Sequence, residues 1–171
     1  MAVIATHSEA ESYLSLLMVS LFGAKPAAGA AIFNLLKANH LQMKAITSVA
    51  AVVLGKESTE MLKPVLKVFE ESAENRNTLA HCMWGLDESI LDGVVLARSN
   101  VAARFSVEVL HAAGQKNAKD RIKKASSSMN DELQIWRECH FQNALSKANK
   151  ASSIMQNSYF EVLKGTLARS R

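Results

Sequence analysis

The sequence contains little cysteine, proline or aromatic residue, and these shortages exclude several classes of protein. Of its 171 residues, two are cysteine, two are proline and 6% are aromatic. The two cysteines, Cys82 and Cys139, show no repeated spacing, which excludes a disulfide framework and a cysteine-rich zinc site. Alanine, leucine, serine, lysine and glutamate are plentiful instead, so the composition favours helices over sheets.

Long hydrophobic runs are also missing. The nearest approach to a membrane span, residues 23–36, is interrupted by Lys25 and Pro26 and is shorter than the ~18 to 20 apolar residues that a span needs. Residues 1–7 lack the basic region and apolar stretch of a secretory signal. We therefore expect a cytoplasmic protein with no membrane partner.

The composition predicts one helical domain. Hydrophobic residues make up 49% of the chain, which is enough to bury a sizeable core. We expect an all-α, up-and-down helical bundle over residues 1–171, while the pattern between residues 86 and 130 is ambiguous. The expected helices are residues 8–22, a second from Pro26, residues 41–54, a fourth from Ser58 or Thr59, and a last from Asp131 or Trp136 to about Leu163. Around residues 90–96, after the fourth helix, a short irregular or extended segment is expected.

Local signals set the expected helix ends and core. Ser8 and Glu11 have the spacing of a capping box, and Pro26 suits a first helical turn that leads into small residues, which allow close helix approach. Pro64 either begins the fourth helix or kinks it, and residues 126–128, all serine, indicate a break. The apolar residues expected inside are Leu14, Leu17, Met18, Leu21, Leu62, Val65, Leu66, Val68, Phe69, Trp136, Phe141, Leu145, Ile154, Met155, Tyr159 and Phe160.

One short stretch brings a permanent cation, an amide and an imidazole together in helical sequence. In Arg-Asn-Thr-Leu-Ala-His, residues 76–81, Asn77 and His81 are four apart and share a helix face. Arg76 and His81 are five apart, about 140° round the helix, so one helix does not bring their heads together neatly. Either the long arginine stem reaches round, or a second copy of the chain supplies the partner across a two-fold axis.

This stretch resembles the signature of the HEPN superfamily, in which an arginine and a polar residue are followed a few positions later by a histidine. Arg76, Asn77 and His81 match that signature position for position. The sequence Ala-His-Cys-Met-Trp that follows is similar to the pattern of an uncharacterised bacterial branch, except that Cys82 stands where that branch has glycine.

The resemblance implies a metal-independent endoribonuclease of a toxin or defence system, in which two motifs form one composite site in a homodimer. His81 would act as general base or acid, Arg76 would hold the phosphate, and Asn77 would orient the histidine or the phosphate. An ordinary imidazole titrates near pH ~6.5 and exchanges protons near neutral pH, whereas arginine stays charged. RNA would be the substrate and an antitoxin protein a partner.

Two other interpretations stay open. His81 can be a hydrogen-bonded structural residue, with Arg76 paired to Glu71 or Glu74 on its own helix. The chain can also be a non-catalytic HEPN-like protein that binds a partner or a nucleotide, because a fold often persists without the reaction. Loss of RNA cleavage on the His81→Ala substitution would distinguish the ribonuclease from both of these interpretations.

The net charge of +4 is unevenly distributed. Between residues 116 and 124 five basic residues accompany only Asp120, and Lys116, Lys119 and Lys123 recur at helical spacing. These lysines are either a solvated helix face or a nucleic-acid-binding patch that contacts phosphates beside the motif. The stretch has no interleaved aromatic residues, so base stacking is not indicated there.

No other pattern predicts a site. The sequence lacks a glycine-rich phosphate loop and a dinucleotide-binding fingerprint, so no cofactor is expected. His7, His40 and His111 have no partner at metal-ligand spacing, and the adjacent Cys139 and His140 would diverge by about 100° on a helix. A bound metal is therefore not expected either.

Overall fold

A computed structural model describes residues 2–23, 25–113 and 115–169, and most of them are helical. They form two compact units. The helical unit comprises Met1–Arg76 and Ala144–Arg171, and the sheet unit comprises Asn77–Asn143. Two helices, α4 (Lys56–His81) and α7 (Glu138–Arg169), continue from one unit into the other. A predominantly helical fold is thus confirmed, while a single domain over residues 1–171 stays a prediction.

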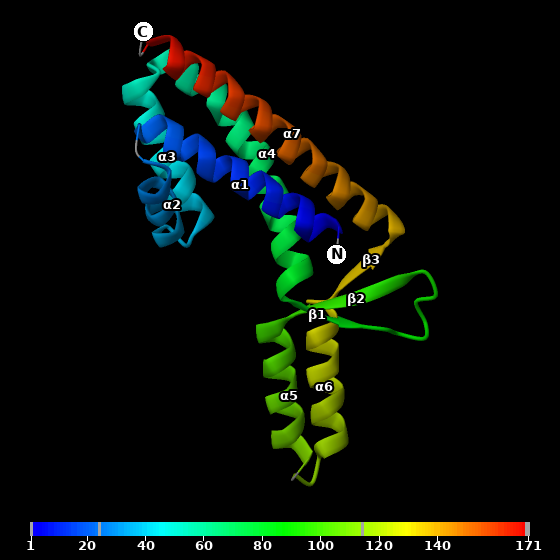
Figure 1. Cartoon of the computed structure of the whole chain (residues 1–171). Helices are drawn as coiled ribbons and strands as arrows, with labels where there is room; N and C mark the ends of the chain where they lie inside the picture. The colour runs from blue at the N-terminus through cyan, green and yellow to red at the C-terminus, as the bar shows by residue number, and fades with distance from the viewer. Residues whose placement is uncertain (1, 24, 114, 170–171) are drawn as a thin grey trace. The chain divides into compact units, whose positions relative to one another are not determined.

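The helical unit is built around α1 (Ala2–Phe22), which supplies the centre of its core (Figure 1). α2 (Pro26–Leu35) and α3 (Asn39–Val53) pack against α1, and residues of α4 and α7 complete the core. Ser152 Oγ on α7 donates a hydrogen bond to Glu9 Oε2 at 2.9 Å, and Gln156 Nε2 donates one to the Tyr13 hydroxyl at 2.9 Å. The buried core residues are Ala10, Leu14, Leu17, Met18, Leu21, Phe33, Met43, Ile46, Ala50, Leu62, Leu66, Phe69, Ala151 and Met155.

The first helix begins at Ala2 and not at Ser8, so the predicted capping box is wrong. The Ser8 hydroxyl donates to the carbonyl of Ile4 at 3.0 Å, as a serine inside a helix does. Val3 and His7 are buried on the core face, and their packing stabilises the additional turns. The four residues predicted to be buried on this helix, Leu14, Leu17, Met18 and Leu21, are all buried.

The second and fourth helices begin close to the predicted positions. α2 starts at Pro26 as expected. Gly55, with a φ of +85°, precedes α4, so Ser58 and Thr59 lie in its first turn and do not cap it. Pro64 lies inside α4 and therefore does not mark its start. Of the predicted apolar stripe of α4, Leu62, Leu66 and Phe69 are buried, while Val65 and Val68 are half-buried.

The sheet unit contains three antiparallel strands in the order β1-β2-β3 (Figure 1). They are β1 (Cys82–Gly85), β2 (Gly93–Arg98) and β3 (Gln134–Arg137). Trp84 on β1 lies opposite Leu96, and Val94 on β2 lies opposite Trp136. The extended segment expected after the motif helix is therefore confirmed at β2, but the sheet itself was not predicted.

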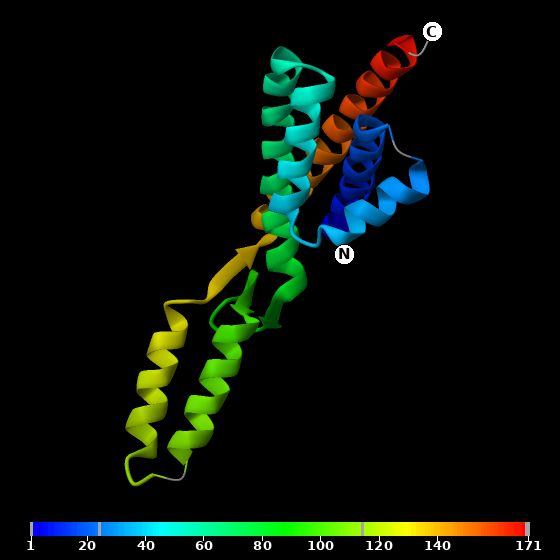
Figure 2. The same ribbon diagram turned by 90° about the vertical axis from the view of Figure 1, so that its left-hand side faces the viewer.

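A helical hairpin is inserted between β2 and β3. Its helices, α5 (Ser99–Ala113) and α6 (Ala118–Asn130), lie side by side in both views (Figures 1 and 2). The break predicted at residues 126–128 is wrong, because these serines lie inside α6. Ser126 Oγ donates to the carbonyl of Ile122 at 2.9 Å, which satisfies the hydroxyl without ending the helix.

The last helix begins later than predicted. α7 starts at Glu138, not at Asp131 or Trp136, because Trp136 lies on β3. Of the residues predicted to be buried in this region, Met155 is buried, Phe160 is 44% exposed, and the others are half-buried. The apolar pattern of β3 was thus misassigned to a helix.

Candidate functional site

Helix α4 places Asn77 and His81 on one exposed face. The two residues are one turn apart, which separates them by about 6 Å along the helix axis. Arg76 is half-buried, with its Nε atom buried, and it lies about 140° round the helix from His81. The unit boundary falls between Arg76 and Asn77. The helix therefore brings Asn77 and His81 to one face.

Two side-chain donors hold the end of α4. Trp84 Nε1 donates to the carbonyl of Leu79 at 3.1 Å, and Ser99 Oγ donates to the carbonyl of His81 at 2.5 Å. The last carbonyls of a helix have no partner within it, so these two bonds stabilise the abrupt change from helix to strand. The backbone that carries His81 is consequently fixed on both sides.

The His81 side chain itself is exposed. Within the described part of the chain, its imidazole forms no hydrogen bond with another residue. The described contacts thus give it no structural hydrogen bond, and its ring is accessible to a ligand. Cys82 follows in extended conformation without a positive φ, so the backbone here does not require the glycine of the similar pattern.

A second histidine lies inside the helical unit and was not singled out by the sequence. His7 Nδ1 lies 2.9 Å from Ser72 Oγ, and the centroids of the His7 and Phe69 rings are 4.9 Å apart. Burial and, to a lesser extent, the nearby charge of Arg76 lower the pKa of His7 from 6.5 to about 4. His7 is therefore neutral near neutral pH.

The His7–Ser72 pair has the residue types of a base and a nucleophile, but its position excludes that chemistry. Ser72 is 0% exposed and His7 is 2% exposed, so a substrate cannot reach either side chain. The pair is a satisfied polar contact in the core.

An aromatic cluster on the sheet unit was also missed. Trp84 and Phe141 have ring centroids 5.9 Å apart, Trp136 and Phe141 are 5.3 Å apart, and Trp136 and His140 are 6.0 Å apart. The Trp84 residue is 53% exposed. Trp136 and Phe141 are half-buried, so Trp84 is the tryptophan of the cluster whose ring is open to solvent.

The lysines of the basic run are exposed on the helical hairpin, at its turn and on the first two turns of α6. Lys116 lies in the turn between α5 and α6, and Lys119 and Lys123 lie on α6. Helix α5 is 15 residues long, so about 22 Å separate this turn from Ser99, which contacts the His81 carbonyl. Within one chain the three lysines therefore do not lie beside His81, contrary to the expectation.

The described residues offer no cluster of three or more histidine, cysteine or acidic side chains that could hold a metal ion. Cys139 Sγ and His140 Nδ1 are 3.7 Å apart, but this nitrogen also accepts a hydrogen bond from the Arg137 backbone N–H at 3.0 Å. Among the described helices, none alone is long and apolar enough to cross a membrane; α1 and α2 meet that test only as a pair, bent by 118°.

Comparisons with known proteins return no relative. No family model matches the chain, and neither a curated protein nor a solved structure matches it. A function must therefore be inferred from the residues themselves.

Proposed function

We propose that this protein is a HEPN-like, metal-independent endoribonuclease of a toxin or defence system. The observation that supports it best is the exposed His81, which shares a helix face with Asn77 at a helix end held by Trp84 and Ser99. RNA cleavage needs a base for the 2′-hydroxyl, an acid for the leaving oxygen and a cation beside the phosphate. An accessible imidazole on a fixed backbone suits the first two tasks.

The proposed site is shared by two copies of the chain in a homodimer. Arg76 and His81 are about 140° apart round α4, so a two-fold axis would let one copy present Arg76 to the phosphate while the other copy's His81 takes the proton from the attacking 2′-hydroxyl. Each dimer would then have two histidines, one as base and one as acid. The Asn77 amide would orient the phosphate or the imidazole.

The RNA would extend from His81 over neighbouring surfaces of the sheet unit. The exposed ring of Trp84 would stack on a base next to the cleaved bond. Lys116, Lys119 and Lys123 would attract the phosphates. The resemblance of residues 76–84 further supports an up-and-down HEPN-like bundle, a cytoplasmic location and an antitoxin protein that masks the site.

A non-catalytic HEPN-like protein that binds a partner or a nucleotide is the second candidate. The observation that favours it is the half-buried Arg76, whose Nε is buried and whose charge acts on His7 inside the helical unit. An arginine held in this way has less freedom to follow a phosphate through the reaction. In this case the exposed face with Asn77 and His81 would bind a ligand without cleaving it.

The two candidates differ in the fate of RNA. Purified wild-type, His81→Ala and His40→Ala proteins are incubated with end-labelled RNA in the presence of a metal chelator, and the fragment ends are analysed for cyclic phosphate. His40 is also exposed but lies on α3, so its variant controls for the loss of a histidine. Circular dichroism verifies that all three proteins are folded.

The ribonuclease predicts cleavage by the wild type and His40→Ala proteins, with loss of cleavage in His81→Ala. Retained cleavage in His81→Ala would show that His81 is not the catalytic residue. Absence of cleavage in all three folded proteins, over a panel of structured and single-stranded RNAs, would favour the binding protein.

A further inference from the structure

The hairpin of α5 and α6 holds the excess positive charge of the chain. Residues 99–130 contain six lysines and arginines but only two acidic residues, a net charge of +4 that equals the net charge of the whole protein. The rest of the chain is therefore neutral overall. Such a concentration produces a local positive potential that attracts polyanions.

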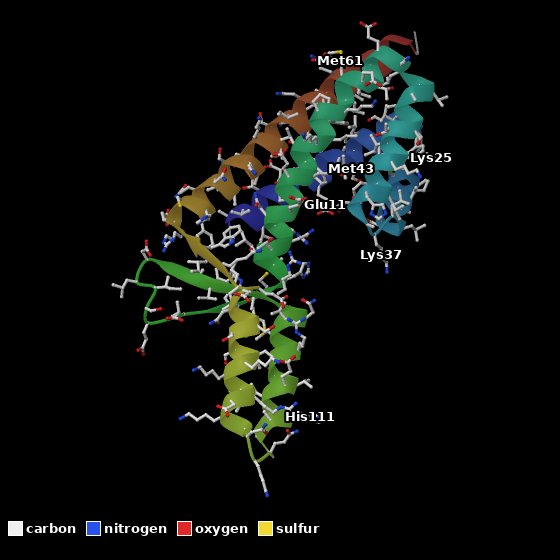
Figure 3. All side chains as sticks on the ribbon, turned by 180° about the vertical axis from the view of Figure 1, so that it is seen from behind. Glu11, Lys25, Lys37, Met43, Met61 and His111 are labelled. Atoms are coloured by element: carbon white, nitrogen blue, oxygen red, sulfur yellow. The ribbon has the colours of Figure 1, made fainter. Side chains whose placement is uncertain are left out.

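A cavity of about 670 Å³ lies between the two helices of this hairpin. Arg121, Lys124 and Asn117 line it from α6 and its preceding turn, and Glu108 and His111 line it from α5. Figure 3 shows His111 near the turn that joins the helices. The cavity therefore combines two cationic side chains with the Glu108 carboxylate and with other side chains that can hydrogen-bond.

The two cations are available to a ligand. Among the described residues no ion pair joins Glu108 to Arg121 or Lys124. Arg121 donates instead to Gln115 Oε1, a neutral group that orients the guanidinium without neutralising it. A phosphate would thus meet an arginine and a lysine, which are the side chains that bind phosphate best.

Helix α6 has two separate cationic stripes. Arg121 and Lys124 face the cavity, whereas Lys119 and Lys123 lie about 100° to 160° round the helix from them. The two parts of the basic surface can therefore be removed independently by substitution.

We propose that the cavity binds phosphate groups of a single-stranded RNA, through Arg121 and Lys124, while the opposite lysine stripe adds general attraction. The inference rests on the proposed function only in naming RNA as the strand. Because the cavity belongs to the hairpin and His81 to the end of α4, the protein would bind its substrate at a distance from the proposed cleavage site.

Binding is measured with a fluorescently labelled, 2′-O-methylated oligonucleotide, which cannot be cleaved through its 2′ oxygen, so the readout is independent of catalysis. Arg121→Gln/Lys124→Gln is compared with Lys119→Gln/Lys123→Gln, which removes the same charge from the other face of the same helix. We expect the cavity variant to weaken binding by about tenfold or more. The slope of log K against log salt concentration should become less steep by about two, one for each cation removed. The control variant should lose clearly less affinity.

A third variant tests the cavity by a gain of binding. Glu108→Gln removes the only carboxylate among the residues that line the cavity, and it should tighten binding. Equal losses in the two double variants, no binding by the wild type, or displacement of the oligonucleotide by AMP at equal concentration would each overturn the proposal. If the wild-type protein binds the oligonucleotide but does not cleave RNA, the proposal of a ribonuclease fails and the proposal of a phosphate-binding cavity stands.

Discussion

The imidazole of His7 and the hydroxyl of Ser72 form a buried pair, with Nδ1 and Oγ 2.9 Å apart. It joins the first helix of the chain to α4, close to Arg76, and it makes the stability of the helical unit dependent on pH. The unfolded chain binds a proton at this histidine near pH 6.5, whereas the folded chain does so only near pH 4. The contribution of His7 to the free energy of unfolding is therefore fully present above about pH 6.5 and is lost as the pH falls towards about 4.

We expect the free energy of unfolding to fall by about 3 kcal/mol through this window, because each unit of pKa shift contributes about 1.4 kcal/mol. Urea unfolding of wild type and His7→Gln, followed between pH 6.5 and 4, measures it. The variant should be less stable at the upper end, and the difference should shrink on acidification. Two parallel curves would show that His7 does not titrate as described.

Removal of the Ser72 hydroxyl should destabilise the protein near neutral pH. Ser72→Ala leaves the buried Nδ1 of His7 without its partner, which costs about 1 to 3 kcal/mol. Ser153→Ala, at an exposed position of α7, is the control and should change stability by less than about 0.5 kcal/mol. Equal stabilities of the two variants in urea would contradict the importance of the pair.

The indole N–H of Trp84 should contribute to stability separately from its ring. Trp84→Phe keeps an aromatic ring beside Phe141 but removes the donor to the Leu79 carbonyl, so we expect a loss of about 1 kcal/mol. Trp136→Phe is the matched control, since its Nε1 is 3.4 Å from Gln134 Oε1, a weaker contact. If both variants unfold at the same urea concentration, the indole bond does not stabilise the helix end.

Close packing of α2 on α1 should make Gly29 intolerant of a side chain. A Cβ at this position would lie 2.5 Å from Val19 Cγ2 and 3.1 Å from Val19 Cβ, so Val19 cannot avoid it by rotating its side chain. Gly29→Ala gains about 1 kcal/mol of helix propensity, and we expect the clash to exceed it, with a net loss of about 1 to 2 kcal/mol.

The double variant Val19→Ala/Gly29→Ala identifies the cause. Val19→Ala removes the 2.5 Å contact with Cγ2 and leaves the looser 3.1 Å contact with Cβ, so the second substitution should then cost clearly less than it does in the wild type. Thermal unfolding of the two single variants and the double variant gives the coupling energy. Additive effects would mean that the two helices are not packed at this glycine.

The sequence predicts the buried face of a helix well, but it predicts helix ends and long-range contacts poorly. The apolar spacing of Leu14, Leu17, Met18 and Leu21 is enough to identify the buried face of α1, since the period of a helix is local. Trp136 was expected in a helix because its role depends on strand partners contributed by β2. The contact of His7 could not be predicted, because Ser72 lies 65 residues away in the chain.

The candidate site shows the same division. The shared face of Asn77 and His81 follows from their spacing and is confirmed by their place on α4. The bonds that hold this helix end could not be predicted, because Ser99 reaches it only through the path of the sheet. The separation of the basic run from His81 likewise depends on the direction of α5.

The insertion of the α5–α6 hairpin between two paired strands has a consequence for evolution. β2 and β3 are hydrogen-bonded neighbours, with Leu96 opposite Gln134, so the points where the hairpin leaves and rejoins the sheet are already adjacent. Added or deleted turns would lengthen or shorten the hairpin without disturbing strand pairing, because closing a longer connection costs little. Selection can thus remodel what the hairpin recognises, in length and in charge, while the residues around His81 remain unchanged.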